Sequence, residues 1–235
     1  MSSMPAMSTS QLDALREVAN VASGHAATAL AQLVGRRTMI SVPEFSLARV
    51  AEIPGLLGYS GTPSVVVVMR LLGDVTGTIV FTLPEAGALT LGRLLLGDAA
   101  SAADGFDELT RSSLAETGNI IGGAYAGVLG TMVQGIVMLS TPEIGIEPLE
   151  HVLAKEGAAA TEELGLCIET RFTLGGSDAE VGGHILLLPD AASLSVMVEA
   201  LEQSARSVEW FIPASGHRRP ASRGKSGTAG SFPEG

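Results

Sequence analysis

One polar motif occurs twice in this chain, and a single shift of 99 positions superposes the two copies. In each copy an acidic or hydroxyl residue is followed after three residues by Glu, after two more by Asn, and after twenty-two more by Pro. A repeat of this kind indicates two equivalent structural units with one copy of the motif in each. The copies are Asp13, Glu17, Asn20 and Pro43, and Ser112, Glu116, Asn119 and Pro142.

The expected order of elements repeats together with the motif. Apolar periodicity and turn residues predict a helix, a strand, an irregular stretch, two strands and a helix in each half. The first half is predicted as 11–34, 38–42, 43–63, 64–72, 76–83 and 85–96, and the second as 108–132, 136–141, an irregular stretch, 164–174, 181–188 and 189–203. We therefore expect one pseudo-symmetric α+β domain over 8–204, with repeat one at about 11–97, repeat two at about 108–203, and a tail at 205–235.

The polar residues of each motif are expected on the outer face of an amphipathic helix. A helix turns about 100° per residue, which sets Glu17 and Asn20 opposite the apolar stripe that contains Leu15. Gly24 and its counterpart Gly123 share that outer face. Exposed Glu and Asn on one helix would be ordinary. However, Asn and Gly are poor helix formers, and both recur at the same places, so we expect a partner to dock there.

Composition and charge restrict the classes of function. The chain of 235 residues is 46% hydrophobic, has one cysteine, and contains no apolar run near the roughly 18 residues of a membrane span. The start lacks the features of a signal peptide, so we expect a soluble, cytoplasmic protein. The net charge is −11; residues 217–235 carry four basic residues and one acid, a net of +3, which leaves −14 for the rest. An acidic body argues against nucleic-acid binding, and the basic tail is predicted to be disordered.

No familiar nucleophile or metal motif is present. Cys167 lacks the spacing of a phosphate-cradling thiol loop, and the four histidines lack metal-ligand spacing. The chemistry is therefore left to Asn and Glu. A carboxamide both donates and accepts hydrogen bonds, so an Asn can hold a water molecule in line with a phosphorus atom. Positioning supplies much of the catalysis in phosphoryl transfer, and the Glu can form an ion pair with a basic side chain of the partner.

Both copies of the motif, with the flanking segments LREVANVASGHAATALAQLVGRR and SLAETGNIIGGAYAGVLG, resemble the CheC family of chemotaxis phosphatases, which includes CheX and FliY relatives. The resemblance covers about residues 10–203. It implies intertwined repeats that form a central sheet, with two long motif-bearing helices and shorter flanking helices. It also implies a phosphatase for the phosphorylated aspartate of a CheY-type response regulator, with Glu17 and Asn20 at one site and Glu116 and Asn119 at the other.

The same resemblance implies further roles and leaves alternatives open. Mg²⁺ would belong to the regulator, so the chain needs no cofactor of its own, and no covalent intermediate would form. The supporting or partner-binding residues would be Asp13, Ser112, Gly24, Gly123, Pro43 and Pro142. The absence of a flagellar-switch domain from this sequence argues against the FliY type. Two alternatives remain: a non-enzymatic regulator that binds the receptor deamidase CheD, and a structural domain whose motif helices pair in a dimer.

Overall fold

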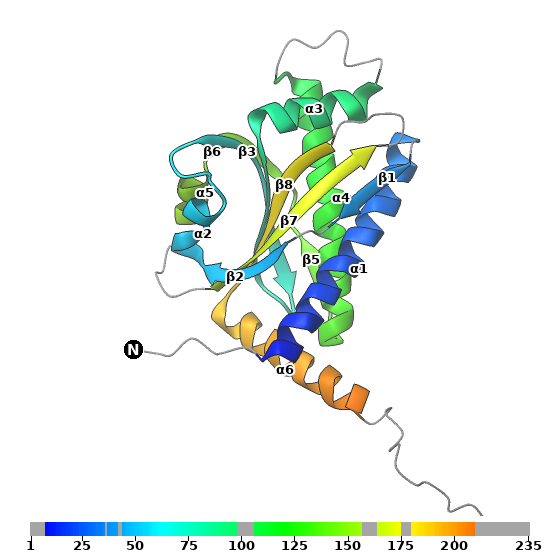
Figure 1. Ribbon diagram of the computed structural model, residues 1–235, viewed down its shortest axis with the longest axis vertical. Helices are drawn as coiled ribbons and strands as arrows, with labels where there is room; N and C mark the ends of the chain where they lie inside the picture. The colour runs from blue at the N-terminus through cyan, green and yellow to red at the C-terminus, as the bar shows by residue number, and fades with distance from the viewer. Residues whose placement is uncertain are drawn as a thin grey trace, which may run out of the picture.

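The computed structural model describes residues 8–35, 37–41, 44–97, 106–156, 164–174 and 180–209. Figure 1 shows a curled sheet with helices on both of its faces and at its two ends. In chain order the elements are α1 (Thr9–Val34), β1 (Thr38–Ser41), β2 (Phe45–Arg49), the 3₁₀ turn η1 (Val50–Glu52), α2 (Ile53–Leu56), β3 (Pro63–Gly73), β4 (Gly77–Pro84), α3 (Glu85–Leu96), α4 (Glu108–Val133), β5 (Val137–Leu139), β6 (Glu143–Pro148), α5 (Leu149–Lys155), β7 (Leu164–Leu174), β8 (Glu180–Pro189) and α6 (Ala191–Glu209).

The strands form one eight-stranded sheet with the order β1-β7-β8-β4-β3-β5; β2 also pairs with β7, and β6 with β3. The strand pairs are antiparallel. Replacing each strand of the first half by its counterpart in the second, β1 by β5 through β4 by β8, and vice versa gives the same strand order read from the opposite edge of the sheet. The first two strands of each half pair with a strand of the other half, which confirms the expected α+β architecture with its central sheet and intertwined connections.

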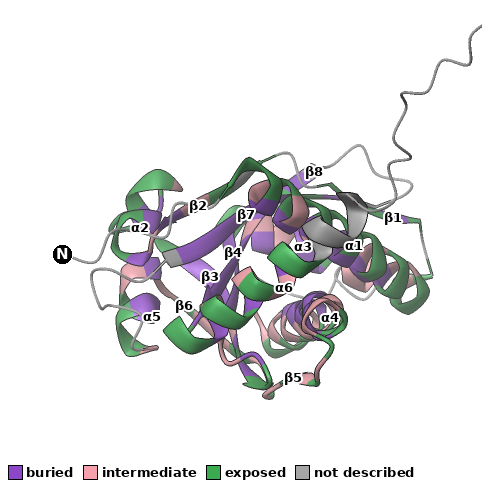
Figure 2. Cartoon of the chain, turned by 90° about the horizontal axis from the view of Figure 1, so that it is seen from below, coloured by how far each residue is buried: buried purple, intermediate pink, exposed green. Residues whose placement is uncertain are grey.

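Each face of the sheet has its own apolar cluster. Side chains alternate between the faces of a strand, so Val65 and Val67 of β3 pack beneath α1, α3 and α4, whereas Val66 packs with residues of α2 and α5. A third cluster joins Leu15 of α1, Leu129 of α4 and Met197 of α6 at one end. Figure 2 shows the same division, with buried residues on the strands and on the inner sides of the helices.

The two long helices are capped and run antiparallel. The Ser8 hydroxyl accepts a hydrogen bond from the Gln11 amide, and the Gln11 side chain accepts one from the Ser8 amide, which completes a capping box. The Asp107 carboxylate caps α4 through the Thr110 amide at 2.8 Å. The start of α1 and the end of α4 both lie against α6 (Figure 1). Because each helix starts beside the end of the other, residues related by the shift of 99 follow one another in opposite directions along the helix pair.

The stretches predicted to be irregular contain short elements that periodicity did not reveal. Residues 43–63 hold β2, η1 and α2, and the corresponding part of the second half holds β6 and α5. These elements are three to seven residues long, too short for a pattern of period 2 or 3.6 to emerge. Their strands exist because β2 pairs with β7 and β6 with β3, far away in the sequence. The last helix also ends later than predicted, at Glu209.

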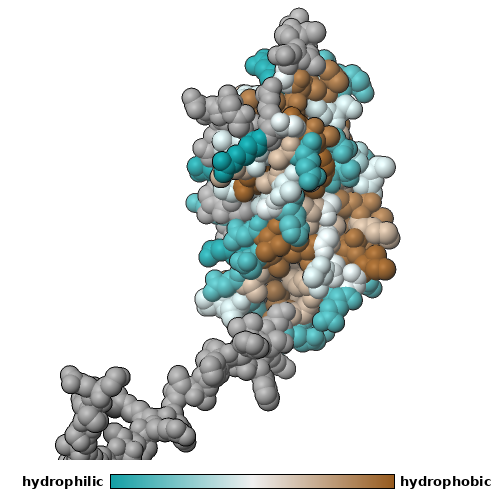
Figure 3. All heavy atoms as spheres, turned by 90° about the vertical axis from the view of Figure 1, so that its right-hand side faces the viewer, coloured by the Kyte–Doolittle hydropathy of each residue, from teal (hydrophilic) through white to brown (hydrophobic). Residues whose placement is uncertain are grey.

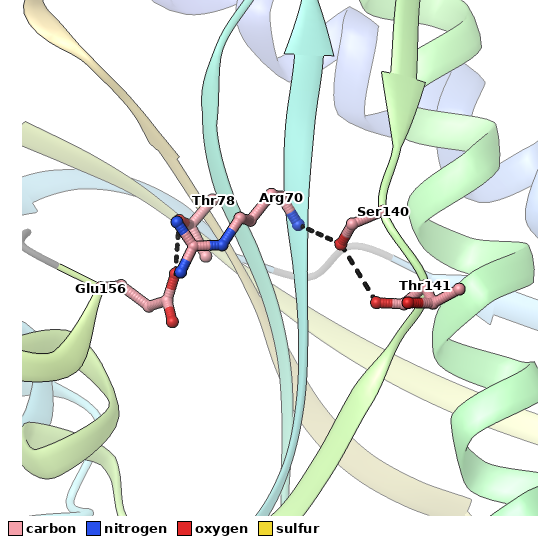
Figure 4. A network of polar contacts seen from close by, with 5 residues as sticks. All are labelled: Arg70, Thr78, Ser140, Thr141 and Glu156. Carbon is pink, nitrogen blue, oxygen red and sulfur yellow. Dashed lines mark hydrogen bonds and ion pairs between the residues drawn. The ribbon is translucent and has the colours of Figure 1, made fainter.

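A network of polar contacts anchors the residues between β5 and β6 to strand β3 (Figure 4). The Arg70 amide donates a hydrogen bond to the Ser140 hydroxyl, which donates one to the Thr141 carbonyl, each at 3.0 Å. The Arg70 guanidinium pairs with Glu156 at 3.3 Å. Pro142 was expected to end a strand; β5 ends earlier, at Leu139, and Pro142 lies just before β6. Proline cannot donate to a sheet ladder, which is consistent with its place between two strands.

Three sequence predictions reach beyond the described residues. Pro43 lies outside them, as does the tail from residue 210 onward. The division into a domain at 8–204 and a disordered tail at 205–235 stays a prediction. Among the residues that the structure describes, none of the helices is both long enough and apolar enough to cross a membrane.

Candidate functional site: two polar helix faces

The first motif lies on the outward face of α1. Leu15, Ala19 and Ala22 are buried against the sheet and α4, and this packing turns the opposite side of the helix to solvent. On that side the motif residues are exposed, as the helical spacing predicted: Asp13, Glu17, Asn20 and Gly24. The site is therefore a convex helical surface, which suits a macromolecular partner that supplies the cavity.

The second motif occupies the equivalent face of α4 but is less exposed. Ser112, Glu116 and Gly123 are exposed, whereas Asn119 is half-buried. The sheet side of α4 carries Gly118, where an added Cβ would lie 2.6 Å from Cγ1 of Val67. This close approach draws α4 onto β3. The two sites thus share residue types while differing in how far the Asn side chain is accessible.

The antiparallel helix pair keeps the two motifs apart. The Tyr125 hydroxyl lies 3.1 Å from the Ser23 hydroxyl and donates a hydrogen bond to the Ala19 carbonyl at 3.4 Å, where the helices meet. Asn20 lies between Ala19 and Ser23, level with this contact, whereas Asn119 lies six residues before Tyr125 in α4. Figure 3 looks onto the side of the molecule that carries the long helices, where polar and apolar residues are interspersed. The structure therefore presents two separate candidate sites.

The polar side chains of the motifs are available to a partner. Within the described part of the chain, the side chains of Glu17, Asn20, Glu116 and Asn119 have no hydrogen bond or ion pair. Asp13 approaches Arg16 at 3.9 Å, with both side chains more than half exposed, and such a pair adds little stability. Within the described residues the Glu and Asn side chains thus add no hydrogen bond or ion pair to the fold, which favours a role in recognition.

Open space surrounds the outward glycines. An added Cβ on Gly24 or Gly123 would meet nothing within 4 Å, and neither residue has a positive φ. Packing and backbone geometry therefore do not require glycine at either position. Glycine is costly in a helix interior, so its presence at both positions favours a surface that a partner approaches closely.

Burial shifts the pKa of two titratable groups in the body of the molecule, Tyr125 and His184. Burial raises the pKa of Tyr125 to about 12, between the helices. A cavity of about 560 Å³, which sequence reasoning did not anticipate, is lined by Tyr59 and His184, on the side of the sheet that packs α2 and α5. Desolvation lowers the pKa of His184, whose Nδ1 lies 3.2 Å from the Tyr59 hydroxyl. In the described ranges no group of three or more His, Cys, Asp or Glu residues is placed to hold a metal ion.

The fold and its paired surfaces define a class: α+β proteins with one central antiparallel sheet and two antiparallel helices that present Glu and Asn outward. Residues 11–47, which span the first motif, match the model of the CheC-like family. CheY-P phosphatase CheC of Bacillus subtilis (strain 168) is 30% identical over 199 residues, which are 83% of this chain and 95% of that protein. The chain belongs to the CheC-like family of chemotaxis phosphatases.

Solved structures support the fold. The chain is similar to Thermotoga maritima FliY, with a TM-score of 0.70, 20% identity, and coverage of 84% of this chain and 98% of the other. It is also similar to a chain in the FliM–SpeE complex of H. pylori, with a TM-score of 0.62, 14% identity, and coverage of 84% and 97%. At these identities the likeness concerns the architecture alone.

Proposed function

We propose that this protein accelerates hydrolysis of the aspartyl phosphate on a CheY-type response regulator. The observation that carries the proposal is the doubled Glu and Asn pair on two surface helices, exposed except for the half-buried Asn119 and without hydrogen bonds or ion pairs among the described residues. The B. subtilis relative, which matches over most of both chains, bears the name of such a phosphatase. A protein of this kind needs no cavity of its own, because the reacting group belongs to the partner.

In the proposed mechanism, Asn20 or Asn119 enters the phosphorylation site of the regulator and orients a water molecule. The carboxamide oxygen accepts a hydrogen bond from the water while its NH₂ group donates to a neighbouring oxygen. The water oxygen forms a bond to phosphorus, the bond from phosphorus to the aspartate oxygen breaks, and the aspartate leaves as a carboxylate. Mg²⁺, which we propose the regulator supplies, neutralises charge on the phosphoryl oxygens. Holding the water in line lowers the entropic part of the barrier.

The glutamates set the register of the complex. Glu17 and Glu116 each lie one turn before the Asn of their helix, and residues three apart are neighbours on a helix surface. We propose that each carboxylate pairs with a lysine of the regulator while the Asn is inserted. The pair is then charge-assisted, and its position relative to the Asn decides where the carboxamide sits.

The test is a comparison of variants that keep the fold. Asn20→Ala with Asn119→Ala is expected to abolish stimulated dephosphorylation, while the melting temperature stays close to that of the wild type because neither side chain has a partner in the fold. Gln32→Ala, which removes another exposed carboxamide from α1, is the matched control and should keep full activity. A folded double variant that still stimulates dephosphorylation would exclude Asn as the catalytic group.

Binding of the deamidase CheD stays a second prediction. A pull-down with purified deamidase would test it, using the wild type and the double Asn variant. If the chain acts only by binding, the wild type captures the deamidase and no regulator is dephosphorylated faster in its presence.

A further inference from the structure

The two candidate sites differ in charge at a position just outside the motif. Arg16 directly precedes Glu17 and is the only Lys or Arg in α1; the shift of 99 places Ala115 at the matching position of α4. Arg16 and Asn20 are four residues apart, so they are neighbours on the helix surface. The Asn20 site therefore has a cationic side chain beside its Asn, and the Asn119 site has a methyl group there.

The guanidinium of Arg16 is free to meet a partner. Its contact with Asp13 is 3.9 Å long, and the side chains of Arg16 and Asp13 are 58% and 67% exposed, so solvent screens the pair. The only basic residue of α4, Arg111, is held in place: it donates a hydrogen bond to the Ile144 carbonyl at 3.0 Å and stacks on the Phe106 ring at 5.4 Å. Arg111 also has no basic counterpart in α1, since Leu12 occupies that position.

The first position of the motif also differs in charge between the two sites. Where Arg16 is present, the first motif position is the acid Asp13; where Ala115 replaces it, that position is the neutral Ser112. Asp13 and Arg16 thus form a weak, exposed pair on the motif face. An Arg can bind carboxylate or phosphoryl oxygens with two parallel hydrogen bonds.

We propose that Arg16 binds the anionic oxygens at the phosphorylation site of the regulator when Asn20 is inserted, and that the Asn119 site works without this contact. The inference rests on the proposed function and deepens it. Any site that holds an aspartyl phosphate and Mg²⁺ is rich in such oxygens. Dephosphorylation at the Asn20 site then depends more steeply on ionic strength than dephosphorylation at the Asn119 site, because Arg16 adds an attraction that salt screens.

Single-site proteins allow a direct test. Asn119→Ala leaves only the Asn20 site, and Asn20→Ala leaves only the Asn119 site. With the Asn20 site alone, Arg16→Ala is expected to lower kcat/KM by about tenfold, the usual scale of one charge-assisted hydrogen bond, and to flatten its salt dependence. Arg16→Lys should restore most of the salt dependence. With the Asn119 site alone, Arg16→Ala should change nothing, whereas Ala115→Arg should raise kcat/KM and steepen its fall with salt.

Binding experiments identify which oxygens are involved. The affinity of the Asn20 site is measured for the unmodified regulator and for the regulator with beryllofluoride and Mg²⁺ as a phosphoryl mimic. If Arg16→Ala lowers the affinity for the beryllofluoride form alone, Arg16 contacts the phosphoryl oxygens. If it lowers the affinity for both forms equally, Arg16 contacts carboxylates.

The inference is overturned if Arg16→Ala leaves the Asn20 site unchanged, or if it weakens both single-site proteins equally, as a structural role would. Failure of the proposed function is a different result, because the wild type would then not stimulate dephosphorylation at all.

Discussion

Replacing the outward glycines with alanine should make the protein more stable. Glycine in a helix interior is about 0.8–1.0 kcal/mol less favourable than alanine. A Cβ on Gly24 or Gly123 meets nothing within 4 Å, so no clash offsets this gain. Gly24→Ala with Gly123→Ala is therefore expected to add about 2 kcal/mol to the free energy of unfolding, which corresponds to about 4–8 °C in melting temperature for a chain of this size. Thermal unfolding followed by circular dichroism measures the shift.

Two further substitutions serve as controls for this prediction. Gly127→Ala, also with open space around its Cβ, should stabilise by the single-site amount, whereas Gly118→Ala should destabilise, because its Cβ would lie 2.6 Å from Cγ1 of Val67 and overpacking costs about 1–3 kcal/mol. A lower melting temperature for the Gly24 and Gly123 double variant would refute the reasoning.

The same positions separate stability from function. If a partner approaches the bare helix face, Gly24→Gln with Gly123→Gln should keep the fold and sharply reduce stimulated dephosphorylation, since the added side chains hold the partner away. Ala29→Gln adds the same side chain at another exposed position of α1 and should leave activity unchanged. Full activity in the glutamine double variant would remove the glycines from the docking surface.

Three other outcomes follow from the interior. Desolvation lowers the pKa of His184, and the carboxylates of Glu169 and Glu44 oppose this shift. Because the unfolded chain then binds the proton more readily, the free energy of unfolding should fall as pH drops through about 6.5. Urea titrations should show that this free energy depends less on pH in His184→Gln. Burial raises the pKa of Cys167 to about 11, so the native thiol should react with iodoacetamide near neutral pH far more slowly than the thiol in denaturant; equal rates would contradict its buried position. Tyr125→Phe leaves the buried Ser23 hydroxyl without its partner and should cost about 1–3 kcal/mol in chemical denaturation.

The long elements could be predicted because each carries its own periodic pattern. Leu15 and the residues at helical spacing from it define α1 without reference to the rest of the chain, and the predicted and observed bounds differ by no more than two residues. The short strands β2 and β6 could not be found in this way, since they exist through pairing with β7 and β3. The contact between the two long helices at Ser23 and Tyr125 is likewise a product of tertiary packing.

The candidate sites were predictable in their residues and only partly in their surroundings. The helical wheel predicted the exposed face of Glu17 and Asn20, which the structure confirms. It did not predict that Asn119 would be half-buried, because burial on the outer face of a helix depends on tertiary surroundings that helical spacing does not encode. The exchange of Arg16 for Ala115 was visible in the sequence, but its relevance depends on the exposed, weakly paired guanidinium that the structure reveals. The catalytic roles of the motif residues stay predictions.

The most direct test of the central claim is phosphate release from a CheY-type regulator in Mg²⁺, phosphorylated by a small donor and present in large excess over this protein. The account predicts that each molecule of protein releases many phosphates, that each single Asn variant keeps part of the rate, and that the double variant matches the regulator alone. Phosphate release that never exceeds the spontaneous rate, with a folded protein and each regulator of the same cell, would contradict it.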